Sequence, residues 1–268
     1  MIRKIAIELV LSVAVIAAVW FGLSQVDWMK LLKIEQTTQS TEAKIGDLFW
    51  DLMKKSENEI TAPLVVEPVD SMLTRICISN SIDPKKIKLH LLRNDEMNAF
   101  ALPNNHLVVY SGLIMACENE AELCGVMSHE LAHIEKNHVM NKLVKEIGLS
   151  VIISMSTENG NAETIKAAIK QLSSSAYDRK LETEADLTAV DYLIEAGIDP
   201  EPFANLMYRL SDETQNLPHQ IFWISTHPES KERAERMIEH IRESGFVKSG
   251  NGDRLKFEEL KERLKESL

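Results

Sequence analysis

His129-Glu130-Leu131-Ala132-His133 is the pattern around which the rest of this chain of 268 residues has to be understood. Residues four apart on a helix face the same side about one turn apart, so both imidazoles can converge on one metal ion. Glu130 lies roughly 100° round the helix from His129. That offset suits a carboxylate that serves as a general base without ligating the metal. The pentapeptide therefore predicts a zinc hydrolase.

The residues around this pentapeptide indicate a helix. HExxH also occurs by chance on exposed helices, so its flanks matter. Asn119 and Glu122 match a capping box at a helix start. Apolar residues then recur at helical spacing, at Ala121, Cys124, Met127, Leu131 and Ile134. We expect a half-buried helix over about residues 119–146.

A catalytic zinc ion usually takes three protein ligands and keeps one position open, so a third ligand is needed. An extended HExxHxxGxxH motif would require Gly and His where Lys136 and Val139 stand. His138 lies five residues after His133, about 140° round the helix. It is expected at the surface or behind the ligands.

The acidic segment 177–186 offers a better candidate. Glu182 and Asp186 lie one helical turn apart, next to a small apolar face of Ala185, Ala189 and Val190. Glu182 could bind zinc while Asp186 holds the free ring nitrogen of a ligand histidine. By composition alone, an exposed acidic helix would be the better explanation of this segment.

Four motifs in order carry a family resemblance: Asn98-Ala99-Phe100-Ala101 with the Gly112-Leu113 turn, HExxH, Glu182-x-x-Ala185-Asp186, and Thr226-His227-Pro228. Together they resemble the HtpX/Oma/BepA-like zinc metalloendopeptidases, which are relatives of the CAAX prenyl proteases. The likeness covers about residues 40–245.

The resemblance implies one Zn²⁺ ion per chain, held by His129, His133 and Glu182. It makes Glu130 the catalytic base and places Asp186 behind the ligands. Glu184 is then an acid without a role at the metal.

In the family, a His-Pro with an Arg six residues after the His helps to form the active-site wall, which maps to His227 and Arg233. We count both as candidate catalytic residues. A His227 that donates a hydrogen bond could stabilise an oxyanion. A neutral His227 could instead fill the open position of zinc and switch the enzyme off. A histidine that merely stands between a loop and a helix remains the third alternative.

Residues 98–110 look like two short strands joined by a turn. Asn104-Asn105 stands where the family usually has Gly-Gly, and Asn tolerates the left-handed conformation of such turns. The resemblance implies that the first strand, with Asn98, Ala99 and Phe100, is an exposed sheet edge lining the cleft. A peptide substrate could add to it as a further strand.

The composition agrees with a compact enzyme. Hydrophobic residues make up 44% of the chain, enough for a core, and a net charge of −11 without a basic patch argues against nucleic-acid binding. Strand signals are few, chiefly at 87–92 and 107–110. We expect a mostly helical α+β fold: a zincin-like metalloprotease domain with a small sheet and an N-terminal transmembrane helix.

The N-terminus predicts the location. An apolar run over residues 5–23 follows Arg3 and Lys4 and is about long enough to cross a bilayer. We expect an uncleaved single-pass anchor with the catalytic domain extracytoplasmic, in a periplasm. Cleavage after Ser24, giving a secreted or periplasmic protein, is the alternative because residues 22–24 are small-x-small. A buried soluble helix is a third.

The expected segments are an anchor or signal over 1–24, a polar stalk over 25–45, the metalloprotease domain over 46–245 and a charged helical tail over 246–268. The tail is expected to be a cap or a partner-binding element. Residues 151–155 are too few to span a membrane, and 156–175 should form a helix and loop near the cleft. The three cysteines are expected to be buried thiols.

These observations predict an endopeptidase that takes proteins or peptides, and by resemblance one that acts in envelope protein quality control. One alternative is a chaperone-like, zinc-containing peptide-binding module with gated or weak proteolysis. Another is a small-peptide hydrolase such as an aminopeptidase, although no motif for binding a free α-amine is evident.

Overall fold

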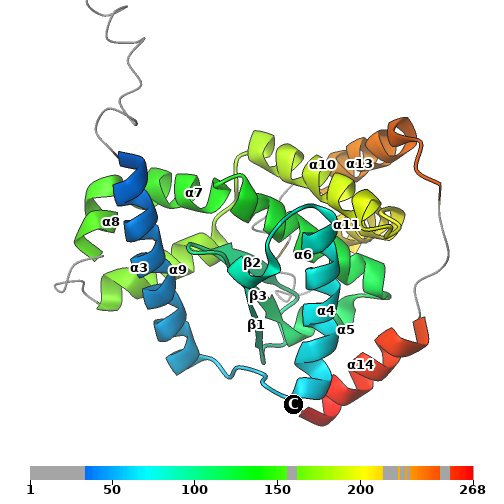
Figure 1. The fold of residues 1–268 in the computed structure, drawn as a ribbon, viewed down its shortest axis with the longest axis horizontal. Coiled ribbons are helices and arrows are strands. Elements are labelled where there is room, and N and C mark those ends of the chain that lie inside the picture. The colour runs from blue at the N-terminus through cyan, green and yellow to red at the C-terminus, as the bar shows by residue number, and fades with distance from the viewer. Residues whose placement is uncertain are drawn as a thin grey trace, which may run out of the picture. The chain divides into compact units, whose positions relative to one another are not determined.

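A computed structural model describes residues 34–155, 162–213, 223, 227, 230–247 and 254–267 (Figure 1). The expected anchor over 1–24 lies outside these residues. Among the described helices, none combines the length and the apolar character that crossing a membrane requires. The chain divides into two compact units, Met1–Glu42 and Ala43–Leu268, and the site belongs to the second. Of the first unit, only residues 34–42 are described, and they are helical.

The sheet has three strands, β1 (Lys88–Leu92), β2 (Ala99–Leu102) and β3 (His106–Tyr110), in the order β1-β3-β2. β3 runs parallel to β1 and antiparallel to β2. The turn between β2 and β3 places Asn104 at φ 62° and Asn105 at φ 60°, the left-handed region that asparagine tolerates. The predicted hairpin is confirmed, and β2 is an edge strand of the described sheet.

The HExxH pentapeptide lies on α6 (Glu120–Glu135), and Asn119 caps this helix by accepting a 3.0 Å hydrogen bond from the Glu122 N–H. The prediction of one continuous helix over 119–146 is wrong. α6 ends at Glu135 and α7 (His138–Ile147) begins after Asn137, whose φ of 57° turns the chain. Asparagine adopts this conformation at little cost. The helical spacing of apolar residues therefore continues past residue 135, although the chain leaves α6 and starts a second helix, α7.

Helices other than α7 also pack against α6. They are α4 (Pro63–Ser79), α10 (Arg179–Glu195) and α11 (Glu201–Glu213), and α13 (Ser230–Ser244) packs on α10 and α11. α6 and α11 approach closely because Gly125 has no side chain. A Cβ there would lie 2.3 Å from Cβ of Phe203. The bundle therefore holds the HExxH helix in a fixed position.

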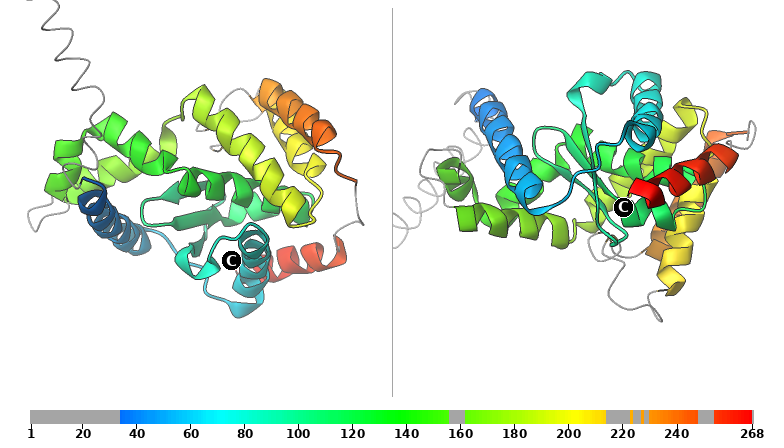
Figure 2. Two further views of the ribbon diagram at one scale, coloured as in Figure 1. Left: turned by 45° about the horizontal axis from the view of Figure 1, so that its top comes forward. Right: turned by 90° about the horizontal axis from the view of Figure 1, so that it is seen from below.

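The two faces of the sheet contribute to two different cores. Ala99, Ala101, Leu107 and Val109 join the core around α6, whereas the alternate residues Phe100, Leu102, Val108 and Tyr110 join a second core. The second core includes residues from Ile45 onward of α3 (Ile34–Ser56), and residues of α7, α8 (Leu149–Met155) and α9 (Ala162–Ser174). The mostly helical α+β class is confirmed, with a sheet covered on both faces (Figure 2).

The remaining elements lie beside the α6 core. They are the 3₁₀ turn η1 (Pro84–Lys86), α5 (Ser111–Ala116) and α14 (Arg254–Ser267). α14 falls in the expected charged tail and packs on α4 and α5. Its residues Phe257, Leu260 and Leu264 are buried in the α6 core. Residues 34–45 of the expected stalk are helical and form the first part of α3.

Candidate metal centre

Four buried side chains from distant parts of the chain converge at α6. The ligand atoms of His129, His133, Glu182 and His227 all lie within 4.8 Å of one another. The Nε2 atoms of His129 and His133 are 3.0 Å apart, and Oε1 of Glu182 lies 3.5 Å from Nε2 of His133. The structure thus brings together the three residues expected to be ligands and adds His227 as a fourth.

Protonation explains why this cluster fits a cation. Burial lowers the pKa of His129 and lowers that of His133 to about 3, so both imidazoles are neutral. Nδ1 of His129 lies 3.1 Å from Oδ1 of Asp186, so a ring proton on Nδ1 would face this carboxylate and leave Nε2 with a lone pair. Nε2 of His129 in turn faces Nε2 of His133. With both lone pairs directed inward, the two nitrogens could bind one cation, and imidazole is a common zinc ligand.

Glu182 supplies the negative charge of the cluster. Its Oε2 accepts from Nη1 of Arg233 at 2.6 Å, and Nδ1 of His227 lies 2.9 Å from its Oε1. Burial opposes ionisation of this carboxyl, but its contacts with the His227 imidazole, the Arg233 guanidinium and the His133 imidazole outweigh burial and hold the pKa of Glu182 well below its usual range. Two neutral imidazoles and one carboxylate are a donor set known for catalytic zinc.

Glu130 lies next to this cluster without belonging to it. Its Oε1 accepts a hydrogen bond from Nε1 of Trp223 at 3.1 Å, and Nε2 of His227 lies 3.4 Å away. Its Oε2 is buried and has no hydrogen-bond partner among the described residues. Burial raises the pKa of Glu130 to about 8. The structure therefore presents a dry carboxyl group with one free oxygen beside the candidate metal position.

The groups behind the ligands fix their orientation. Arg233 donates to both oxygens of Asp186 at 2.7 Å, and Asp186 contacts His129. His138 is buried, not on the surface, and its Nδ1 lies 3.1 Å from Nδ1 of His133. Of the two positions expected for His138, the one behind the ligands is thus observed. Arg233, expected in the wall of the active site, instead joins the two carboxylates.

Glu184 lies outside the cluster. Its Oε2 is 3.6 Å from Nε2 of His138, and its side chain is 43% exposed. This position agrees with the expectation that Glu184 has no role at the metal.

Two aromatic residues at the site were assigned no role from the sequence. Tyr177 stacks on His133 with ring centroids 4.0 Å apart and an interplanar angle of 26°. Trp223 is fully buried and contacts Glu130. Its carbonyl accepts a 2.9 Å hydrogen bond from the His227 N–H. The spacing of four between Trp223 and His227 was the available signal, because it places both side chains on one face of a helical turn.

The candidate substrate strand borders the same site. Asn98 precedes β2, and its carbonyl accepts from the Tyr110 N–H at 3.0 Å. Ala99 and Phe100 begin β2, opposite Val109 and Val108. All four residues of β2 are buried, and Ala99 has no exposed surface, so the expectation of an exposed edge is wrong. The N–H of Trp223 donates to the Met97 carbonyl at 3.2 Å, so the residue that contacts Glu130 also contacts the start of this edge.

Comparisons with known proteins agree with this geometry. Residues 64–241 match the model of peptidase family M48. The beta-barrel assembly-enhancing protease of Yersinia pestis is 23% identical over 218 residues, covering 74% of this chain and 45% of that protein. The mitochondrial metalloendopeptidase OMA1 of Schizosaccharomyces pombe is 28% identical over 180 residues, covering 66% of this chain and 53% of that protein.

A third relative is shorter. The metalloprotease LoiP of Escherichia coli is 25% identical over 201 residues, covering 70% of this chain and 78% of that protein. The chain spans about half the length of the first two relatives. The matched region contains α6, α10 and nearly all of α13, the helices that carry the three expected ligands and Arg233, and it also contains His227.

Proposed function

Because the chain belongs to peptidase family M48, we propose that it is a zinc-dependent metalloendopeptidase with its active site at the α6 cluster. The observation that carries this proposal is the convergence of His129, His133 and Glu182 beside a buried Glu130 with one free oxygen. In the proposed assignment, these three residues hold one Zn²⁺ ion. Zinc bound there would act as a Lewis acid toward the scissile carbonyl and would lower the pKa of water to about 7.

The free oxygen of Glu130 gives this residue its proposed role. Glu130 would accept a proton from the attacking water and pass it to the leaving amine. Burial raises the pKa of this carboxyl group in the metal-free protein, and a bound Zn²⁺ ion would lower it again toward the working pH, where acid–base catalysis is most efficient. The indole N–H of Trp223 restrains the other oxygen and fixes the direction in which Oε2 points.

The edge of β2 is the proposed substrate site. Asn98 and Tyr110 are joined by a backbone hydrogen bond. Hydrogen-bonded and non-hydrogen-bonded pairs alternate along an antiparallel ladder, so the next pair, Ala99 and Val109, is not hydrogen-bonded, and the backbone N–H and C=O of Ala99 point away from β3. A peptide lying along this edge could pair with Ala99 as an added strand. Asn98 and Phe100 would fix the strand from the β3 side.

His227 is the residue with two opposed proposed roles. Its Nδ1 lies 2.9 and 3.0 Å from the two oxygens of Glu182 and 3.1 Å from Nε2 of His129. Burial lowers the pKa of His227 to about 4, so the ring is neutral. A neutral imidazole in this position is a metal ligand more readily than an oxyanion donor. We therefore favour the inhibitory role, in which His227 takes the position that water needs.

The physiological role is proposed from the relatives. Two of the similar proteins are named a beta-barrel assembly-enhancing protease and a mitochondrial metalloendopeptidase. We propose that this chain degrades misfolded or surplus envelope proteins from a membrane-anchored, extracytoplasmic position. A chaperone-like clamp with weak proteolysis is the second candidate. The contact of His227 with the proposed ligands favours it, because a blocked metal would allow binding without cleavage.

Zinc content and casein cleavage of the purified chain, beside Glu130→Gln, test the proposal. We expect about one zinc per chain in both proteins and a loss of cleavage by a factor of roughly 10² to 10⁴ in the variant. Zinc-free wild-type protein that still cuts casein would overturn the mechanism. Zinc in both proteins with cleavage by neither would favour the clamp. A casein peptide with a blocked amino terminus separates an endopeptidase from an aminopeptidase, because only the former cuts it.

A further inference from the structure

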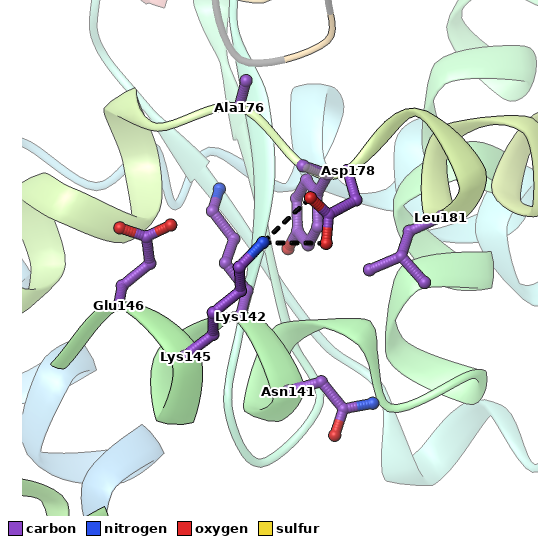
Figure 3. A pocket seen from close by; sticks show the side chains of 8 residues that line it. Asn141, Lys142, Lys145, Glu146, Ala176, Asp178 and Leu181 are labelled. Carbon is purple, nitrogen blue, oxygen red and sulfur yellow. Dashed lines mark hydrogen bonds and ion pairs between the residues drawn. The ribbon is translucent and has the colours of Figure 1, made fainter. Parts of the chain in front are cut away.

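A small cavity lies beside the metal cluster, between α7 and the connection from α9 to α10 (Figure 3). Its volume is about 80 Å³, and it is lined by Asn141, Lys142, Lys145, Glu146, Ala176, Tyr177, Asp178 and Leu181. Two lysines from adjacent turns of α7 face it. Lys145 is exposed and pairs with Asp178 at 2.9 Å, whereas Lys142 is buried. Of these two lysines, only Lys142 therefore has a charge whose removal from water is unfavourable and must be offset by contacts within the protein.

The ammonium of Lys142 is satisfied by carbonyls and by an aromatic ring. It donates to the Leu172 carbonyl at 2.9 Å and to the Ser175 carbonyl. These carbonyls lie at the C-terminal end of α9, where the helix dipole favours a cation. Its Nζ also lies 3.9 Å from the centroid of the Tyr177 ring, close enough for a cation–π interaction. One buried charge thus joins α7 to the end of α9 and to Tyr177.

The Tyr177 ring is held from both sides. Lys142 Nζ lies 3.9 Å from its centroid and the His133 ring centroid lies 4.0 Å from it. Two groups at this distance would collide on one face, so they occupy opposite faces. Tyr177 itself is 9% exposed. The ring therefore transmits the position of Lys142 to His133.

His133 needs this support more than His129 does. The His129 ring is oriented by Asp186, which a bidentate Arg233 holds in turn. The described contacts of His133 behind the cluster are a neutral neighbour, His138, and the stacked face of Tyr177. Stacking fixes the plane of an imidazole and keeps water from that face.

We infer that Lys142 is a positioning residue of the metal site, which clamps the end of α9 and presses the Tyr177 ring against His133. This inference rests on the proposed function, because it assigns His133 to a bound zinc ion. Lys142 touches neither substrate nor metal and acts through Tyr177. Residues behind metal ligands typically contribute about 10- to 100-fold to metal affinity or activity.

The test measures the zinc dissociation constant of the full-length chain by competition with a chelating dye. Lys142→Met keeps the length and apolar stem of the side chain but removes its charge and its donors. Lys145→Met is the matched control, since it removes the other lysine of the same cavity. Tyr177→Leu removes the ring, and Tyr177→Phe keeps it. Circular dichroism verifies that each variant is folded.

We expect Lys142→Met and Tyr177→Leu each to weaken zinc binding about 10-fold and to lower kcat more than they raise KM. Lys145→Met should match wild type, and Tyr177→Phe, which keeps the ring, should weaken zinc binding less than Tyr177→Leu does. The double variant Lys142→Met/Tyr177→Leu should bind zinc no more weakly than either single variant, because both substitutions remove the same contact with His133. Unchanged zinc affinity in folded Lys142→Met, or full additivity in the double variant, overturns the inference.

Two further outcomes keep the test decisive. Should Lys142→Met not fold, Lys142→Gln replaces it in the same cycle, since its amide keeps N–H donors for the carbonyls but lacks the charge. Wild-type protein that binds no zinc would contradict the proposed function itself. Zinc binding by wild type that no Lys142 variant changes would contradict only the role of Lys142.

Discussion

Arg233 and Asp186 form a bidentate ion pair inside the protein, with Nε and Nη2 of the guanidinium each 2.7 Å from one carboxylate oxygen. Both side chains are nearly inaccessible to solvent, at 2% and 3% exposed. Oδ1 of Asp186 also lies 3.1 Å from Nδ1 of His129. The guanidinium therefore fixes the carboxylate that orients the first proposed zinc ligand.

Arg233→Lys should destabilise the metal-free protein and weaken zinc binding. A lysine cannot reproduce two parallel bonds to Asp186 together with the contact to Glu182. Breaking a buried ion pair typically costs about 3 to 5 kcal/mol, and we expect a loss of about 3 kcal/mol in the free energy of unfolding. Urea unfolding measures it. Arg236→Lys, on the same helix but at an exposed site, is the control. Equal stability of both variants would show that the pair is not needed.

Sequence periodicity was sufficient to predict the local parts of this site. The spacing of His129 and His133 predicts a shared helical face, and Glu182 and Asp186 lie one turn apart on α10 as expected. The hairpin at Asn104 was predictable because its conformation is set by the turn residues themselves. The end of α6 was not, because a single left-handed Asn137 interrupts an otherwise continuous helical pattern.

Contacts between distant segments could not be predicted from spacing. Trp223 and Glu130 are 93 residues apart in sequence, and Arg233 and Asp186 are 47 apart. No periodicity connects such residues, so their roles followed only from the fold or from the family resemblance. Lys142 is a similar case. A lysine on a polar helix face gives no sign that it will be buried under the end of another helix.

His227→Ala should raise proteolysis if His227 occupies the open position of zinc. Removing the imidazole leaves Glu182 with its Arg233 partner, so the three proposed ligands should still bind zinc. If the contact between His227 and zinc stabilises the blocked state by about 1.4 kcal/mol, casein cleavage should rise about 10-fold in the variant. Zinc content measured in parallel is the control. A loss of cleavage in a folded, zinc-loaded variant would instead favour oxyanion stabilisation by His227.

Acid should destabilise the packing of α3 through His106. This imidazole is 2% exposed, and its Nε2 lies 3.2 Å from Oδ1 of Asp47 on α3. Burial, together with the nearby charge of Lys88, lowers the pKa of His106 to about 4. The unfolded chain, with a histidine pKa near 6.5, binds more protons between about pH 6.5 and 4. The contribution of the neutral His106 to stability is therefore fully present above pH 6.5 and is lost as the pH decreases from 6.5 to about 4.

The slope of this loss is at most about 1.4 kcal/mol per pH unit for a single histidine. Urea unfolding of chelator-treated protein at several pH values between 4 and 7.5 measures it. In His106→Gln the slope should be smaller by up to this amount, whatever the absolute stability of the variant. An identical slope in the variant would show that His106 does not contribute to the acid sensitivity.

Ala99→Pro tests the proposed substrate edge. In the β2–β3 register the backbone N–H of Ala99 points away from β3, so proline removes a donor that the sheet does not use. Proline is tolerated on edge strands for this reason. If a peptide pairs with this edge, the variant loses one hydrogen bond to the substrate, which contributes about 0.5 to 1.5 kcal/mol. KM for peptides should rise roughly 2- to 12-fold, with little change in kcat.

The neighbouring position supplies the control for this experiment. The backbone of Phe100 faces Val108, so Phe100→Pro removes a hydrogen bond of the sheet itself and should lower the thermal midpoint. Ala99→Pro removes no hydrogen bond of the sheet, so it should lower that midpoint less than Phe100→Pro does, although it adds ring atoms at a fully buried position. A stable Ala99→Pro enzyme with unchanged KM would contradict pairing at Ala99 and would require the substrate to enter the α6 cluster from another side.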